Sequence, residues 1–137
     1  MAEPEIQVVN VRDGGYTIYI GRGSCLGNPF VIGKDGDRNQ VIEKYRVWLP
    51  DQPELMKTLD SLRDEILGCY CHPLPCHGDV LVQLVRQRDF IIDVANRLEV
   101  WTVESIRSEY RERYGKEIDR GFTEKVATER KLKNSAR

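Results

Sequence analysis

The sequence contains no apolar run of about 18 residues, the length that a membrane-spanning helix needs. Its first residues, MAEPEIQ, also lack the basic and apolar regions that are typical of a secretion signal. We therefore expect a soluble protein that stays in the cytoplasm of a bacterium or of a phage-infected host cell. The four cysteines are then more typical of free thiols or metal ligands than of disulfides.

An excess of positive charge is absent as well, since 21 Lys and Arg stand against 22 Asp and Glu. The 137 residues carry a net charge of −1, so the chain lacks the basic surface of a general nucleic-acid-binding protein. The charge is uneven, with a net −4 over residues 1–103 and a net +3 over residues 104–137. The basic C-terminal part is either an arm that contacts a protein or nucleic-acid partner or a solvated helical surface, and the sequence leaves both open.

Several well-known catalytic and phosphate-binding motifs are missing. No Gly-Lys-Ser/Thr follows the glycine-rich stretch at residues 21–27, which excludes a Walker A loop. Asn28-Pro29-Phe30 stand where a dinucleotide-binding fold needs the start of a helix. The cysteines have neither the trailing arginine of a tyrosine phosphatase nor the C-x-x-C spacing of a thiol oxidoreductase.

Two strand-like segments open the chain. Residues 6–11 (IQVVNV) and 16–21 (YTIYIG) are rich in β-branched and aromatic side chains. Asp13-Gly14-Gly15 between them is a strong turn signal, because the glycines tolerate positive φ. The sequence therefore predicts an N-terminal antiparallel hairpin.

Helical patterns follow the hairpin. Asp37 and Gln40 form a capping-box pattern, and the helix that they begin is expected to stop at Pro50. A second helix is expected from Pro53 to Gly68, with a leucine on almost every turn.

The second half of the sequence alternates in the same way. We expect a short strand ending at residues 69–71, a long helix from about Asp79, and a strand over residues 98–103. Residues 104–132 read as helix with a break near Gly115 or Gly121. This order predicts a single compact α/β domain with a mixed sheet, in which residues 1–103 form the core and residues 104–137 form a basic helical extension.

The densest group of reactive side chains is C-Y-C-H-P-L-P-C-H-G-D, which spans residues 69–79. It contains three thiols, two imidazoles and a carboxylate: Cys69, Cys71, His72, Cys76, His77 and Asp79. Cys76 and His77 directly precede the predicted helix, whose N-terminus favours a thiolate or a bound phosphate. This turn is therefore a candidate site for anion binding or catalysis.

Three interpretations of the cluster compete. In the first, Cys76 is a nucleophile with a lowered pKa, and His77 or His72 is its proton partner, or His77 itself is the acid or base. In the second, Cys69, Cys71, Cys76 and His77 hold a zinc ion, although the ligands form one continuous run instead of two separated pairs. In the third, the cysteines are small buried core residues.

The glycine-rich stretch is the second candidate site. Gly21, Arg22, Gly23 and Ser24 could hold an anion through backbone N–H groups and a planar guanidinium, and Asn28 could orient the rest of a ligand. The alternative is a purely structural turn in which Arg22 forms a salt bridge. If this loop meets the cysteine–histidine turn in space, one crevice at the carboxyl ends of the strands would contain Arg22, Ser24, Asn28, Cys76 and His77.

Both motifs together resemble a known family. Y-I-G-R-G-S-x-L-G-N-P-F at residues 19–30, followed by C-Y-C-H-P-L-P-C-H-G-D-V-L at residues 69–81, is similar to domain of unknown function 4326, a family of phages and bacteria. The resemblance covers about residues 7–90. It departs from the family at Cys25, where the family loop has proline, which argues against a special role for that thiol. The resemblance implies where the site lies, but it does not indicate which reaction takes place there.

Two functions remain open. The leading hypothesis is an enzyme, or a degraded enzyme, that handles a nucleotide, a nucleoside or a similar phosphorylated small molecule. In it, Arg22, the glycine loop and the turn at residues 76–79 hold the anion. The alternative is a non-enzymatic binding module, with or without zinc, that contacts a protein or nucleic acid through its C-terminal extension.

Overall fold

The computed structural model describes residues 3–98 and 100–135, and it describes side chains up to residue 129. Its contacts divide the chain into two compact units, residues 1–85 and residues 86–137. The long helix α3 (His77–Arg97) crosses that division, so its first turns belong to the first unit and the remainder to the second. None of the described helices has the length and apolar character that crossing a membrane requires.

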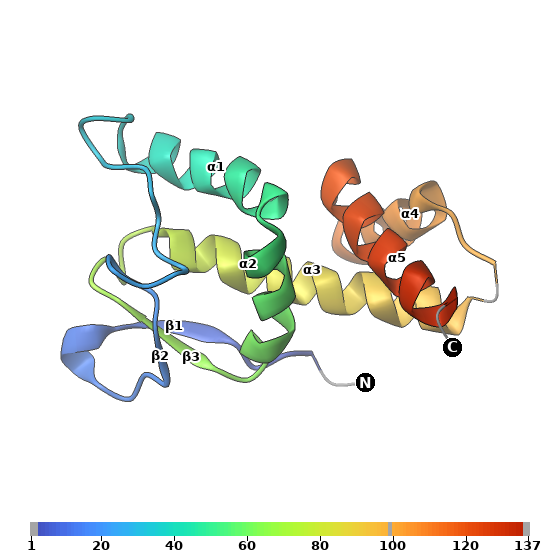
Figure 1. The fold of residues 1–137 in the computed structure, drawn as a ribbon, viewed down its shortest axis with the longest axis horizontal. Coiled ribbons are helices and arrows are strands. Elements are labelled where there is room, and N and C mark those ends of the chain that lie inside the picture. Colours follow the sequence, from blue (N-terminus) through green and yellow to red (C-terminus); the bar gives the residue numbers. More distant parts are fainter. Residues whose placement is uncertain (1–2, 99, 136–137) are drawn as a thin grey trace. The chain divides into compact units, whose positions relative to one another are not determined.

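The first unit contains a three-stranded parallel sheet (Figure 1). Its strands β1 (Gln7–Asn10), β2 (Ile18–Tyr19) and β3 (Ile66–Cys69) lie in the order β1-β3-β2. β3 pairs in parallel with both neighbours, Gln7 opposite Ile66 and Ile18 opposite Leu67. Because all three strands run the same way, their carboxyl ends meet at one edge of the sheet.

The expected hairpin is wrong, although the α/β class is confirmed. β1 and β2 do not pair with each other, because β3 lies between them and bonds to both, so the described sheet is parallel instead of mixed. The chain does turn at Gly14 and Gly15, where φ is +72° and +80°. A short 3-10 helix at Val11–Asp13 widens that connection, so that it passes across the position of β3. The predicted turn is therefore present, but the sequence of the turn did not determine which strand pairs with β1.

The helices between β2 and β3 begin as their caps predict. α1 (Arg38–Trp48) starts at Asp37, which accepts a hydrogen bond from the Gln40 N–H while the Gln40 side chain accepts one from the Asp37 N–H, both at 2.8 Å. α2 (Pro53–Thr58) is shorter than expected and continues as a 3-10 turn over Leu59–Leu62. Gly68 lies inside β3 and does not end a helix.

The core of the first unit lies between the sheet and these helices. Each fully buried aliphatic side chain contributes about 1.5–3 kcal/mol relative to an exposed one. The fully buried residues include Ile6, Ile20, Tyr45, Leu49, Leu59, Leu62, Leu67 and Leu81. They come from strands, helices and 3-10 turns alike, so the site elements rest on a continuous apolar base.

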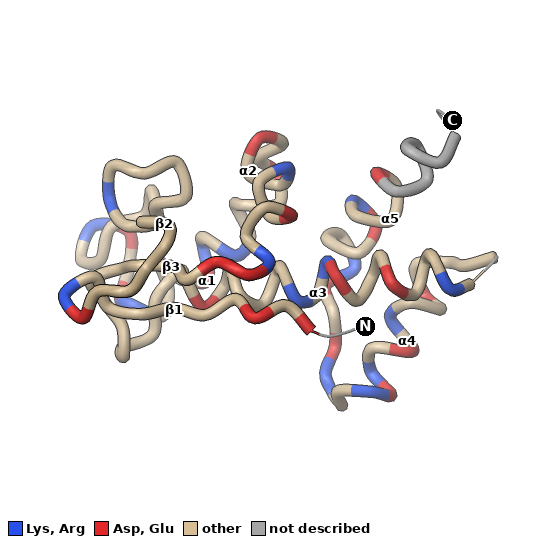
Figure 2. Tube along the Cα trace, turned by 90° about the horizontal axis from the view of Figure 1, so that it is seen from below, with Lys and Arg blue, Asp and Glu red and all other residues tan. Residues whose placement is uncertain are grey.

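The second unit is helical. It contains the end of α3, then α4 (Val103–Tyr114) and α5 (Arg120–Ser135). The expected break is confirmed at Gly115, which caps α4 in the left-handed conformation with φ +67°. Lys and Arg alternate with Asp and Glu along α4 and along the first turns of α5 (Figure 2).

The expected strand over residues 98–103 is wrong, since its described residues adopt no strand. Thr102 instead caps α4 by accepting a hydrogen bond from the Ser105 N–H at 3.0 Å. Val100 is 86% exposed, so the β-branched side chains of this segment are not gathered into a sheet face. A strand needs a partner to satisfy its backbone, whereas a cap satisfies the helix start locally.

Candidate functional site

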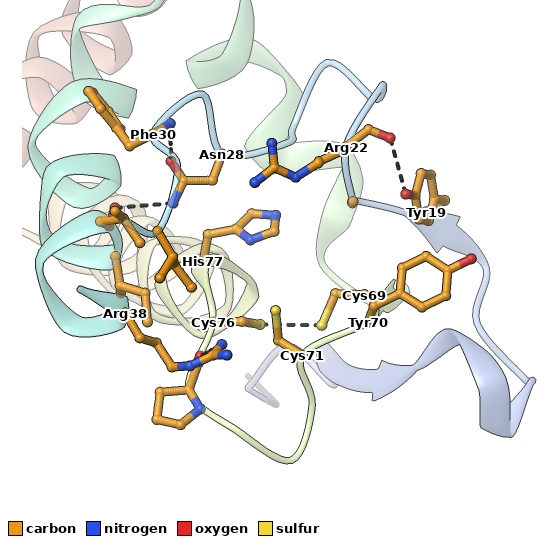
Figure 3. Close-up of a pocket in the computed structure, with 15 residues that line it drawn as sticks. Tyr19, Arg22, Asn28, Phe30, Arg38, Cys69, Tyr70, Cys71, Cys76 and His77 are labelled. Atoms are coloured by element: carbon orange, nitrogen blue, oxygen red, sulfur yellow. Dashed lines mark hydrogen bonds between the residues drawn. The ribbon is translucent and has the colours of Figure 1, made fainter. Parts of the chain in front are cut away.

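A cavity of about 320 Å³ opens at the carboxyl ends of the strands, as ligand sites do in open α/β sheets (Figure 3). The glycine loop and the cysteine–histidine turn both reach it, so the two candidate sites of the sequence meet in one place. The cavity is lined by Tyr19, Gly21, Arg22, Asn28, Phe30, Ile32, Arg38, Val41, Ile42, Cys69, Tyr70, Cys71, Pro75, Cys76 and His77. None of these side chains is a carboxylate, so the lining carries positive charge without a compensating acid.

The glycine loop is shaped around Tyr19, the last residue of β2. The Tyr19 hydroxyl donates a hydrogen bond to the Arg22 carbonyl oxygen at 3.1 Å, which folds the ring back over the loop. A Cβ atom at Gly21 would lie 2.3 Å from that hydroxyl oxygen. A larger residue at position 21 would therefore displace the Tyr19 ring from the loop. The loop also places Arg22 at the cavity.

Two arginines supply the positive charge. The Arg22 guanidinium points into the cavity (Figure 3), and no carboxylate in the described part of the chain forms an ion pair with it. This argues against the alternative of a structural salt bridge at Arg22. Arg38, the first residue of α1, donates a hydrogen bond from Nη1 to the Pro75 carbonyl oxygen at 3.1 Å. The two guanidiniums come from different elements, and both residues line the cavity.

His77, the first residue of α3, lies in the cavity wall and is 8% exposed. Its Nε2 atom is 2.7 Å from the Ile20 carbonyl oxygen. Since a carbonyl only accepts, Nε2 carries the proton in this contact and Nδ1 is left as an acceptor. Burial lowers the pKa of His77 from its ordinary value, which keeps the ring neutral near pH 7. A neutral imidazole with one fixed nitrogen is suited to accept a proton or a hydrogen bond through the other.

The structure does not support an activated thiol at Cys76. Its Sγ atom lies 3.3 Å from the Cys69 Sγ and accepts a hydrogen bond from the Gly78 N–H at 3.3 Å. Burial and the neighbouring Cys69 raise the pKa of Cys76 above its ordinary value. The expected lowering of this pKa by the helix N-terminus is therefore wrong, because desolvation of the thiolate outweighs the helix field.

The predicted zinc site is not assembled either. No group of three or more His, Cys, Asp or Glu side chains among the described residues is placed to hold a metal ion. Cys69 and Cys76 are in contact, but His77 uses Nε2 for a backbone carbonyl. A zinc ion needs four donors that converge in a tetrahedron, and here they do not converge.

Three other predicted ligand-binding residues have structural roles. The Ser24 hydroxyl donates to the Gly21 carbonyl at 2.7 Å, and Gly23 provides the positive φ of the same turn, +90°. The exposed Asp79 carboxylate accepts a hydrogen bond from the Cys76 N–H at 3.1 Å, which caps the start of α3. None of the three lines the cavity.

Asn28 lines the cavity but is largely committed to the fold. Its amide donates to the Val41 carbonyl at 3.1 Å and accepts from the Phe30 N–H at 2.9 Å. These bonds attach the loop to α1, and they leave one N–H and one lone pair of the amide for a ligand.

Eight residues of the lining were not predicted from the sequence, and four of them are aromatic or charged: Tyr19, Phe30, Arg38 and Tyr70. The position of Tyr70 could have been inferred from the sequence, because it stands between two cysteines of the predicted site at the end of a strand. No sequence pattern pointed to Arg38, since the first position of a helix is ordinarily solvated. The tertiary fold alone brings it to the Cys–His turn.

Comparisons with known proteins agree with this picture of the first unit. The family described as Domain of unknown function (DUF4326) matches residues 8–87, which include both motifs. The chain is also similar to "Uncharacterized 12.4 kDa protein in nrdA-td intergenic region" of Enterobacteria phage T4, with 36% identity over 86 residues, 59% of this chain and 78% of that protein. No solved structure matches. The match spans more than half of the chain and the whole cavity lining, and the protein belongs to the DUF4326 family.

Proposed function

We propose that this protein binds a phosphorylated small molecule, such as a nucleotide, in the cavity at the carboxyl ends of its strands and acts on it. One observation carries the proposal: the cavity has two arginines and a neutral histidine in its wall and no carboxylate. Such a lining suits an anion, because the guanidinium forks match phosphate oxygens and nothing acidic opposes them. A volume of about 320 Å³ also lies in the range of small-molecule sites.

Each polar residue has a separate part in this proposal. Arg22 and Arg38 bind the phosphate, and the N-terminal end of α3 adds the field of the helix dipole. His77 acts as the proton acceptor through Nδ1, while its bond to the Ile20 carbonyl fixes the ring. Cys76 has no chemical role in the reaction; it packs against Cys69 under the cavity wall.

Binding is tested with purified protein by isothermal titration against inorganic phosphate, ribose 5-phosphate and nucleoside mono-, di- and triphosphates. Arg22→Gln should weaken the best ligand by about 10- to 100-fold, since a charge-assisted pair contributes about 1.5–3 kcal/mol. Arg46→Gln is the matched control: Arg46 is also on α1, pairs with Glu43 at 3.1 Å and does not line the cavity. Equal loss in both variants, or no binding by any ligand, would refute the proposal.

The role of His77 is tested on the ligand that binds. His77→Gln keeps an amide N–H that can reach the Ile20 carbonyl, but it removes the ring nitrogen that titrates. We expect the affinity to change by less than about threefold and turnover of the bound molecule to fall by about 100-fold or more. Turnover at the wild-type rate would remove His77 as the proton acceptor.

The expected contact of the C-terminal extension with a partner stays a prediction. Three arginines of that region are ion-paired inside it: Arg107 and Arg120 with Glu104, each at 3.0 Å, and Arg111 with Glu117 at 2.5 Å. These exposed pairs are typical of a solvated helical surface. The basic excess itself comes from residues 130–137, whose side chains lie outside the described part of the chain.

A further inference from the structure

The cavity has an aromatic wall that phosphate binding leaves unused. Tyr19 ends β2, and Tyr70 follows the last residue of the neighbouring β3. Their ring centroids are 6.2 Å apart with an interplanar angle of 75°, the edge-to-face arrangement. Figure 3 shows both rings on one side of the cavity and Phe30 on the other. The wall is therefore built by two strand ends that the parallel sheet brings together.

The Tyr70 side chain is fixed by its neighbours but remains exposed to solvent. The Arg12 guanidinium lies over its ring, 5.7 Å from the centroid. From the end of β1, the Asn10 side chain donates hydrogen bonds to the carbonyls of Tyr70 at 3.2 Å and His72 at 2.8 Å. Despite these contacts, Tyr70 is 56% exposed while it lines the cavity. A large aromatic side chain that is fixed but open to solvent is available to a ligand.

The aromatic wall is joined to the anion-binding side. The Tyr19 hydroxyl donates to the carbonyl of Arg22, and the Tyr19 ring packs edge-on against Tyr70. One residue thus links the ring that faces solvent to the loop that carries the guanidinium. A ligand that satisfies both must carry a flat ring close to its anionic group.

This combination narrows the class of ligand. Inorganic phosphate or a sugar phosphate would satisfy the arginines but leave the tyrosines bare. A nucleoside phosphate has both parts, because its base offers a π face for stacking and its phosphate a partner for Arg22. We infer that the ligand is a nucleoside phosphate whose base stacks at Tyr70, and that Tyr70 determines specificity for nucleotides over sugar phosphates. The inference rests on the proposed phosphate binding by Arg22.

Stacking is tolerant of the kind of base, since every base presents a π face. The lining contains no acid, and its one side-chain amide, Asn28, lies beside Phe30 on the side of the cavity opposite Tyr70 (Figure 3). We therefore expect adenosine and uridine monophosphate to bind within about tenfold of each other, with the purine stronger because its stacking area is larger.

The test compares adenosine 5′-monophosphate with ribose 5-phosphate by isothermal titration on the full-length protein. In the wild type, the nucleotide should bind about 5- to 100-fold more tightly, the range that one stacked base provides. Tyr70→Leu should remove this difference and leave the affinity for ribose 5-phosphate unchanged, whereas Tyr70→Phe should keep it. Leu74→Ala is the matched control, because Leu74 is 54% exposed on the same loop and does not line the cavity.

The outcomes separate the two proposals. Equal affinity of the wild type for both ligands, or a nucleotide preference that survives Tyr70→Leu, overturns the stacking inference and leaves phosphate binding intact. Loss of both ligands to the same degree in Tyr70→Leu also overturns it, since a stacking residue acts on the base alone. No binding of either ligand overturns the stacking inference together with the proposed function. Circular dichroism of each variant confirms that the exposed substitution has left the fold unchanged.

Discussion

The Nε2 atom of His77 lies 2.7 Å from the carbonyl oxygen of Ile20, and this contact joins the first residue of α3 to the end of β2. The bond spans 57 positions of the sequence and is buried. It fixes the tautomer of the imidazole and orients the ring that faces the cavity. The hydrogen bond attaches α3 to the edge of the sheet and also holds the proposed proton acceptor in place. Its loss should therefore lower both the stability of the fold and the activity.

Neutral His77 makes the stability of the fold depend on pH. Its pKa is lowered by burial, so at mildly acidic pH the unfolded chain binds a proton that the folded chain does not. The free energy of unfolding should therefore be highest above about pH 6.5 and fall as the pH drops below it, by at most about 1.4 kcal/mol per pH unit from this residue. The measurement is urea unfolding from pH 7.5 to 5, with His77→Gln compared at each pH. Identical slopes for the two proteins would mean that His77 is not held neutral.

Tyr45 supports the same ring from α1. It is fully buried, packs edge-on against His77 with centroids 5.1 Å apart, and donates its hydroxyl to the Leu26 carbonyl at 2.7 Å. Tyr45→Phe leaves that carbonyl without its partner and should cost about 1–3 kcal/mol of unfolding free energy. Tyr16→Phe, at a side chain that is 40% exposed, should change stability by less than about 0.5 kcal/mol. A loss of similar size in both would contradict the role of the buried hydroxyl.

Gly78, in the first turn of α3, packs closely against side chains at the sheet. A Cβ atom there would lie 2.9 Å from Ile20 Cδ1 and 3.0 Å from Val8 Cγ2, both in the core. Gly78→Ala should therefore destabilise the protein by about 1–3 kcal/mol and weaken ligand binding with it, because the start of α3 must shift. The helical control Gly121→Ala meets only the Asp119 carboxylate, at 3.3 Å, and should be neutral or slightly stabilising. An unchanged free energy of unfolding in Gly78→Ala would contradict this, because it would show that the start of α3 has room for a side chain.

The four thiols should fall into two classes of reactivity. Cys25 is exposed and Cys71 is half-buried, whereas Cys69 and Cys76 are 1% and 3% exposed. With a thiol reagent at pH 8, two groups should react in the native protein and all four only after unfolding. The raised pKa of Cys76 slows its reaction further, because the thiolate is the nucleophile. About one bound zinc per chain with Cys69, Cys71 and Cys76 protected would contradict this assignment and restore the metal site.

Short sequence patterns predicted those features of the fold that depend on neighbouring residues, such as the ends of helices. The capping box at Asp37 and Gln40 fixed the start of α1, and Gly115 marked the end of α4 because it alone could adopt a left-handed cap there. The two polar motifs predicted the position of the site, since loops after strands meet at the carboxyl edge of a parallel sheet. In each case the physical cause acts within a few residues or follows from chain direction.

Long-range partners were not predictable in the same way. Gly14 and Gly15 indicated a turn, but the insertion of β3 between β1 and β2 depends on residues 66–69. The segment from Leu98 to Val103 has strand propensity without a strand to pair with. At Cys76, the helix N-terminus suggested a low pKa, whereas the burial that reverses it is a property of the packed core.

The central claim is that a phosphorylated ligand binds in the cavity between the glycine loop and the start of α3. Backbone amide chemical shifts, recorded by NMR during titration with adenosine 5′-monophosphate, locate the ligand directly. Saturable shifts should concentrate at Gly21, Arg22, Cys71 and His77, and the amides of α4 and α5 should move little. Shifts confined to other residues, or none at millimolar nucleotide, would contradict the claim.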